Sequence, residues 1–161
     1  YAVNDPTQSP YNMLWPSLLP LVAWMAGISE EILYRLFAVA LFKKWFRSTF
    51  VAVLLSSLFW AFGHAGYTIY PSYTRIIEVT VLGFLFSYIF LRYGLLTAVF
   101  AHTTMDSLLF GLSLMTGMPS ARYVWIGLLY MALPAIVAFL LFRLHRLIGK
   151  FRKGASFPGA P

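Results

Sequence analysis

Long apolar segments separated by short polar breaks dominate the chain. The apolar segments cover about residues 13–42, 49–63, 76–91, 95–115 and 123–142. The breaks between them contain basic residues, Gly or Pro: residues 43–47, 67–75, 92–94 and 116–122. Several segments approach the roughly 20 apolar residues that a helix needs to cross a bilayer. The pattern predicts an all-α, polytopic transmembrane helical bundle with about five to six membrane helices.

The first segment is longer than one straight crossing requires. Pro16, Pro20 and Gly27 are expected to divide it into a lead-in helix and a second helix that starts near Ser29. The Ser29 hydroxyl would cap that second helix. In the last segment, Pro134 is expected to bend the helix without ending it.

The same pattern divides the chain into three parts. We expect an N-terminal lead-in at 1–12, a single transmembrane domain at 13–145, and a basic, disordered cytoplasmic tail at 146–161. Residue 1 is Tyr, and the lead-in lacks the basic start and apolar core of a signal peptide. We therefore expect a processed product or a domain excised from a longer protein.

Composition and charge narrow the class of protein. The chain is 60% hydrophobic and only 11% charged, which excludes an ordinary soluble domain. It has no Cys, so it has neither a disulfide framework nor a thiolate metal site. The net charge of +7 comes from basic residues at the ends of apolar segments. Such residues set topology and contact lipid head groups, so we expect no nucleic-acid partner.

The basic residues also predict an orientation. Arg75 and Arg122 lie on one side of the alternating spans. The other side collects Lys43, Lys44, Arg47, Arg92, Arg143, Arg146, Lys150, Arg152 and Lys153. By the positive-inside rule, we expect a multi-pass protein of a bacterial cytoplasmic membrane with a cytoplasmic C-terminus.

Acidic residues inside the apolar segments are the main functional signal. Four of the five carboxylates lie there: Glu30, Glu31, Glu78 and Asp106. A charge at mid-bilayer costs about 2.5 to 3.5 kcal/mol or more, so such residues are candidates for a functional site. At about 1.5 Å of rise per residue, one layer of the bilayer holds Glu30, His64, His102 and Asp106. This layer lies in the half of the bilayer away from the cytoplasm.

Residue spacing suggests how the acids are used. Glu31 and Arg35 are at i and i+4, so they can pair on one helix face. Glu30 is rotated by about 100° and cannot share this partner equally. The spacing predicts one structural carboxylate and one freer carboxylate, the second a candidate general base. Glu78, three residues after Arg75, is expected to form a local interfacial ion pair.

The histidines leave two chemistries open. His64 follows Trp60 by one turn on the same face, and His102 and Asp106 are also at i and i+4. If a metal is present, His64, His102 and Asp106 with Glu30 would hold Zn²⁺ and leave a position open for water. Without a metal, Glu30 and His64 would polarise a water. His102 and a protonated Asp106 would then stabilise the oxyanion.

Three motifs in order carry a family resemblance. Glu-Glu-x-x-x-Arg at 30–35, aromatic-x-x-x-His at 60–64 and His-x-x-x-Asp at 102–106 lie on three hydrophobic helices. Together with the stretch 83–106, they resemble the CPBP family of intramembrane proteases. This family includes the type II CAAX prenyl endopeptidases and abortive-infection-type proteins. The resemblance covers about residues 24–113.

The resemblance implies hydrolysis of a peptide bond in a membrane-associated protein or peptide, within the bilayer. Glu30 would activate the water and His64 would assist it. His102 and Asp106 would line the oxyanion site. Glu31 and Arg35 would orient the glutamates. Within this family we favour water activation without any cofactor, with Zn²⁺ as the alternative.

The chain departs from the family pattern at two positions. Trp60 stands where Phe is usual, and Asp106 stands where Asn is common in the prenyl endopeptidases. Asp occurs in bacterial-type relatives, so this departure argues against a prenyl protein as substrate. One alternative function is a non-catalytic membrane immunity or regulatory interaction protein. Another is a transporter or metal-binding channel, for which a longer chain with repeated halves is expected.

Overall fold

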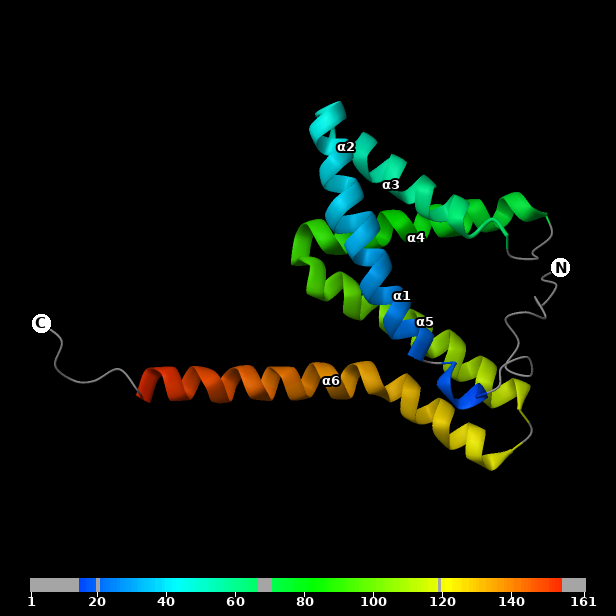
Figure 1. Ribbon diagram of the computed structural model, residues 1–161, viewed down its shortest axis with the longest axis vertical. Helices are drawn as coiled ribbons and strands as arrows, with labels where there is room; N and C mark the ends of the chain where they lie inside the picture. Colours follow the sequence, from blue (N-terminus) through cyan, green and yellow to red (C-terminus); the bar gives the residue numbers. More distant parts are fainter. Residues whose placement is uncertain (1–14, 20, 67–70, 119, 155–161) are drawn as a thin grey trace, which may run out of the picture.

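The computed structural model describes residues 15–19, 21–66, 71–118 and 120–154, and its regular elements are all helical. They are the 3₁₀ turn η3 (Pro16–Leu18), α1 (Leu21–Glu30), the π-helical η4 (Glu31–Ala38), α2 (Val39–Phe46), α3 (Thr49–Gly63), α4 (Ser72–Tyr93), α5 (Leu95–Gly117) and α6 (Ala121–Gly154) (Figure 1). The all-α prediction is confirmed. The expected lead-in at 1–12 lies outside the described residues.

The segments α1, η4 and α2 form one continuous helix, because the junction residues Glu30 and Ala38 keep helical backbone angles. This helix ends at Arg47, which takes a left-handed conformation with φ of 55°. The next helix, α3, begins after Ser48, whose hydroxyl accepts a hydrogen bond from the Val51 N–H at 3.3 Å. Such a cap satisfies one of the free N–H groups at the start of a helix.

The expected helix start near Ser29 is wrong. Ser29 lies inside the continuous helix, where its hydroxyl donates to the Met25 carbonyl at 2.7 Å. Gly27 is not a break either, because it is buried against Thr103 of α5. A Cβ atom at Gly27 would collide with the Thr103 hydroxyl oxygen. Gly27 therefore serves the close approach of two helices, which is a common use of small residues in membrane proteins.

Gly27→Ala is expected to lower the stability of the protein by about 1 to 3 kcal/mol, because the added methyl group overpacks the α1–α5 contact. Gly149→Ala is the matched control, since nothing lies within 4 Å of a Cβ at this helical position. There Ala should be neutral or stabilising, as Ala is the better helix former. Thermal unfolding in detergent measures both variants. Equal melting temperatures for the two would contradict the proposed role of Gly27.

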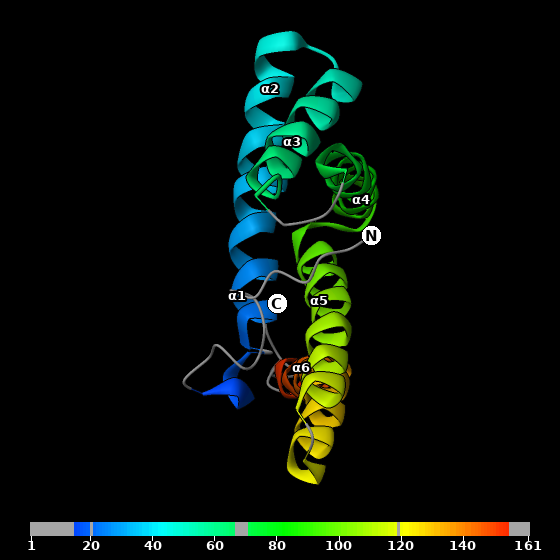
Figure 2. The ribbon, with the colours of Figure 1, turned by 90° about the vertical axis from the view of Figure 1, so that its right-hand side faces the viewer.

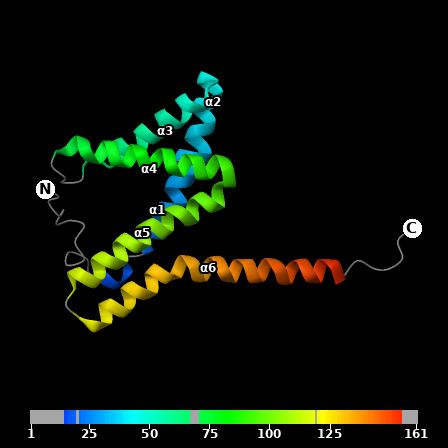
Figure 3. The same cartoon turned by 180° about the vertical axis from the view of Figure 1, so that it is seen from behind.

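Helices adjacent in sequence pack against each other, and the continuous helix also contacts α4 and α5, which lie farther along the chain. In Figure 2 the continuous helix runs beside α5, and α3 returns along α2. Figure 3 shows α4, α5 and α6 following one another in a zigzag. The turn between α4 and α5 uses Gly94 with φ of 90°, a conformation that favours Gly. Through these contacts, the continuous helix faces α3, α4 and α5 together.

Three helices are long and apolar enough to cross a membrane: Tyr73–Tyr93, Leu95–Gly117 and Ala121–Gly149. The helix Thr49–Gly63 is apolar but shorter. Many large apolar side chains on these helices are exposed, as expected of surfaces that face lipid. The larger count of five to six membrane helices stays a prediction.

The last helix, α6, contains Pro134 and does not end there. Figure 1 shows α6 bending between its yellow and orange parts, the stretch that contains this Pro. The helix continues through residues 146–154, which the sequence pattern assigned to a disordered tail. This stretch contains no Pro, and Arg146, Lys150, Arg152 and Lys153 are residues that favour helix. Residues 155–161 of the expected tail lie outside the described residues.

Candidate active site

The carboxylates of the first motif lie at a π-helical segment. Glu30 is the last residue of α1, and Glu31 opens η4. The Tyr34 carbonyl accepts the Val39 N–H, five residues on, and also the Ser56 hydroxyl of α3 at 2.5 Å. Segments of π-helix inside α-helices often mark functional sites. Here the segment buries its two charged side chains toward the other helices.

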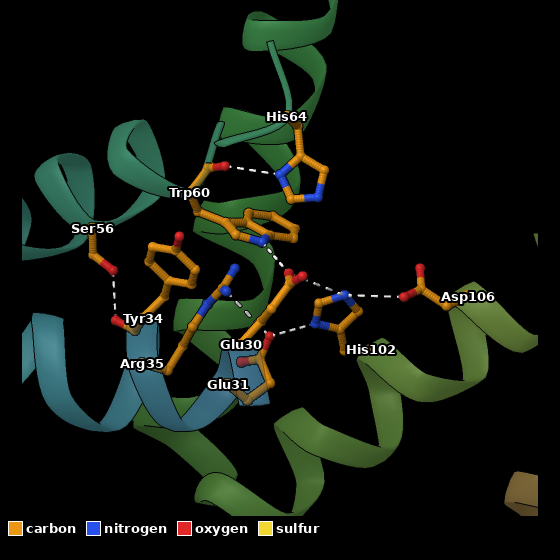
Figure 4. Close-up of polar contacts among 9 residues, drawn as sticks. All are labelled: Glu30, Glu31, Tyr34, Arg35, Ser56, Trp60, His64, His102 and Asp106. Carbon is orange, nitrogen blue, oxygen red and sulfur yellow. Dashed lines mark hydrogen bonds and ion pairs between the residues drawn. The ribbon is translucent and has the colours of Figure 1, made fainter. Parts of the chain in front are cut away.

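Glu31 is fully buried and bridges two partners. Its Oε1 atom lies 3.2 Å from Arg35 Nη1, so the predicted i, i+4 pair is confirmed. The same oxygen lies 2.7 Å from His102 Nδ1 (Figure 4). An ionised carboxylate only accepts, so Nδ1 is the donor. Glu31 therefore fixes the ring orientation of His102, a contact that adds to the role implied by the resemblance, in which Glu31 and Arg35 orient the glutamates.

Arg35 is also buried, with 1% of its surface exposed. Its guanidinium carbon lies 4.3 Å from the centre of the Trp60 ring and 5.4 Å from that of Phe86. The faces of aromatic rings attract cations, so these contacts add to the ion pair with Glu31. A charge in the middle of the bundle is thus balanced by one carboxylate and two rings.

His102 contacts side chains of its own helix and of two other helices. Its Nε2 atom lies 3.4 Å from Asp106 Oδ2 and 4.0 Å from Glu30 Oε2, so the predicted convergence of His102 and Asp106 is confirmed. Its ring stacks on Phe86 of α4, with centroids 4.7 Å apart and planes 13° apart. A proton shared at Nε2 would satisfy both His102 and Asp106. The imidazole is therefore presented to the site in one orientation.

Glu30 occupies a more open position than Glu31. Its side chain is 26% exposed, and its Oε2 accepts a hydrogen bond from the indole Nε1 of Trp60. It lines a cavity of about 310 Å³. The lining consists of Ser29, Glu30, Leu33, Tyr34, Trp60, Gly63 and His64. The predicted division into a structural and a freer carboxylate matches this difference in burial.

His64 caps the C-terminal end of α3 and faces the same cavity as Glu30. Its Nδ1 lies 2.9 Å from the Trp60 carbonyl oxygen. A carbonyl only accepts, so Nδ1 carries the proton and donates it. The His64 ring also meets the Trp60 ring edge-on, with centroids 5.2 Å apart. The structure thus brings His64 to the site through Trp60.

Phe86 and Ser56 also contact this network, and neither was assigned a role from the sequence. Phe86 lies on α4, which carries none of the three motifs, and its aromatic character was not distinguishable from that of many lipid-facing residues. Ser56 lies in an apolar run, and its contact with Tyr34 spans 22 residues of sequence. The spacing of polar residues in the three motifs could not predict the contact of Phe86 with His102 or that of Ser56 with Tyr34.

A metal site was the open alternative. Among the described residues, no group of three or more His, Asp or Glu side chains is arranged to hold a metal ion. Histidines that bind a metal commonly donate their other ring N–H to a carboxylate or a backbone carbonyl. The contacts of His102 Nδ1 with Glu31 and of His64 Nδ1 with the Trp60 carbonyl therefore do not exclude a metal. The predicted Zn²⁺ set of His64, His102, Asp106 and Glu30 stays an alternative, and no step is derived through a metal.

Glu78 lies apart from this network. Its Oε2 is 3.7 Å from Arg75 Nη1, and its side chain is 59% exposed. The predicted local ion pair is confirmed. Glu78 is therefore not assigned to the site.

The fold and the site together define an all-helical membrane protein with a buried cluster of carboxylates and histidines. Residues 12–108, more than half of the chain, match the family described as Type II CAAX prenyl endopeptidase Rce1-like, and the chain belongs to this family of integral membrane proteins. The match spans all three motifs, so the resemblance carried by them is confirmed. Comparisons with curated proteins and with solved structures give no match.

Proposed function

We propose that this chain is an intramembrane endopeptidase that hydrolyses a peptide bond in a membrane-associated protein or peptide. Family membership supports proteolysis. The observation that carries the proposal is the division between two neighbouring carboxylates: Glu31 is fully buried on Arg35 and His102, whereas Glu30 lines the cavity. Two adjacent acids in different environments are the usual arrangement for two different roles.

Glu30 is assigned the role of general base. A water in the cavity gives a proton to the Glu30 carboxylate as its oxygen attacks the carbonyl carbon of the scissile peptide bond. The new C–O bond leaves a negative charge on the carbonyl oxygen. When the C–N bond breaks, Glu30 returns the proton to the leaving amine. The exposure of Glu30 to the cavity supports this role.

The other polar residues are assigned to charge stabilisation and orientation. Donors that are already in place stabilise a developing oxyanion at no cost of reorganisation. His102 Nε2, with Asp106 at 3.4 Å, is the proposed donor. Glu31 and Arg35 hold His102 in orientation, and His64, which also lines the cavity, assists the water.

We also propose a multi-pass protein of a bacterial cytoplasmic membrane, with five to six membrane helices and a cytoplasmic C-terminus. The α4–α5 turn and the C-terminal end of α6 lie on one side of the molecule, opposite the C-terminal end of α5 (Figure 1). Arg92 precedes that turn, and the last part of α6 is strongly basic. This distribution supports the orientation through the positive-inside rule.

The test compares protein termini in membranes of cells that express the intact chain or the Glu30→Gln variant. New termini that depend on Glu30 would identify both the activity and its substrate. A third sample treated with a metal chelator addresses the cofactor, and the same termini should persist, since the proposed mechanism uses no metal. Identical termini with intact chain and variant, at equal protein levels, would refute proteolysis and favour an immunity or regulatory protein.

A further inference from the structure

Trp60 lies at the centre of the site. It belongs to α3, is 2% exposed, and donates its indole N–H to Glu30 Oε2 (Figure 4). The indole is the point at which α3 contacts the candidate base of the continuous helix. An indole nitrogen can only donate, so Trp60 acts on Glu30 as a fixed donor.

The packing around Trp60 fixes the direction of this donor. The Arg35 guanidinium covers one face of the ring, 4.3 Å from its centre. The rings of His102 and Phe86 meet it edge-on, with centroids 5.4 and 5.9 Å away. Trp60 also belongs to a buried apolar cluster with Ala61 and Val79. With its neighbours packed in this way, the indole has one orientation.

Glu30 is less constrained by its surroundings. Its side chain is partly exposed on a cavity wall, where a flexible carboxylate can adopt several rotamers. A general base works only when its oxygen lies within reach of the proton that it removes. A rigid donor that binds one carboxylate oxygen reduces this freedom and leaves the other oxygen for the water.

We propose that Trp60 is a positioning residue that holds the Glu30 carboxylate against the cavity through its indole N–H. The inference rests on the proposed function, in which Glu30 is the base. Trp60 itself touches no reacting atom in this scheme. The contribution of Trp60 to kcat depends on its indole N–H group. It can be measured separately from the contribution of the ring volume to stability.

The structure offers a matched control for this separation. Trp24 lies on the continuous helix, not on α3, and packs edge-on against Phe100, with centroids 5.7 Å apart. Its buried indole nitrogen has no hydrogen-bond partner among the described residues. Trp24→Phe and Trp60→Phe make the same chemical change, but only the second removes a donor from Glu30.

The experiment measures kcat and KM of the full chain in liposomes, on the substrate identified from the termini. Trp60→Phe is expected to lower kcat about tenfold, the scale of a lost hydrogen bond to a charged group, with KM changed by less than about twofold. Trp24→Phe should leave both constants unchanged. Trp60→His keeps a ring N–H but loses more volume, so it should retain more kcat than Trp60→Phe while melting at a lower temperature.

Opposite rankings of activity and stability in the two Trp60 variants would support positioning through the N–H group. The same ranking in both measurements, or an unchanged kcat in Trp60→Phe, would overturn it. So would failure of both variants to fold while Trp24→Phe folds, since Trp60 would then supply packing alone.

A second measurement separates this inference from the proposed function. A double-mutant cycle of Trp60→Phe with Glu30→Ala in thermal unfolding needs no turnover, and Ala removes the oxygen that accepts the indole N–H. If the intact chain cleaves nothing, the proposed function fails. Non-additive melting shifts would then still establish the contact between Trp60 and Glu30, and additive shifts would refute it.

Discussion

Glu30→Gln is expected to lower kcat by about 10² to 10⁴-fold, the usual contribution of a general base. The amide has nearly the same size as the carboxylate, and its oxygen can still accept the Trp60 indole N–H. The amide does not take a proton from water near neutral pH. The variant should therefore fold and melt close to the intact protein, and lose only the chemical step. Turnover of the identified substrate in liposomes measures the effect.

Glu78→Gln is the control for this prediction. It is the same substitution at another carboxylate of the membrane helices, one that is exposed and forms a local ion pair with Arg75. Exposed ion pairs contribute little, so the control should keep its rate within about twofold. If Glu30→Gln kept more than a tenth of the intact rate, Glu30 would not be the general base.

Arg35→Met is expected to destabilise the protein by about 3 to 5 kcal/mol, because it leaves the buried Glu31 carboxylate without its compensating charge. The double variant Glu31→Gln/Arg35→Met should regain much of this loss, since replacing both members of a buried pair is often neutral. Its activity should stay low, because a neutral amide no longer holds His102 as a carboxylate does. Stability and activity should thus respond differently to the second substitution.

Thermal unfolding in detergent and turnover in liposomes measure these two effects. Arg75→Met is the matched control, since Arg75 pairs with the exposed Glu78. Its expected cost is smaller than that of Arg35→Met, because the partner Glu78 is exposed and solvent weakens such an ion pair. If Arg35→Met melted as the control does, the buried pair would not support the fold. Full activity in the double variant would refute the role of Glu31 in holding His102.

Both predictions follow from the separation of two acids that are adjacent in sequence. Glu30 ends α1 and Glu31 begins η4. Glu30 nevertheless lines a cavity, whereas Glu31 is fully buried in the bundle. His102 lies between them, with one ring nitrogen on Glu31 and the other toward Glu30. One helix thereby supplies both the proposed base and the carboxylate that orients its partner histidine.

The sequence by itself determined the features that depend on local spacing. The apolar run 49–63 coincides with α3, and the run 95–115 falls within α5. The contacts of Glu31 with Arg35 and of His102 with Asp106 follow from i, i+4 geometry, which any helix provides. The three motifs also sufficed to identify the family.

The tertiary structure alone decided which groups meet between helices. The contacts of Glu31 with His102, of Trp60 with Glu30 and of Phe86 with the His102 ring each join different helices. In a membrane protein the lipid-facing surface is as apolar as the core, so hydrophobic periodicity does not show how each helix is rotated. The use of Gly27 for close packing, where the sequence suggested a break, has the same cause. Helix rotation and crossing are set by side-chain packing between helices, which is encoded jointly by residues far apart in the chain.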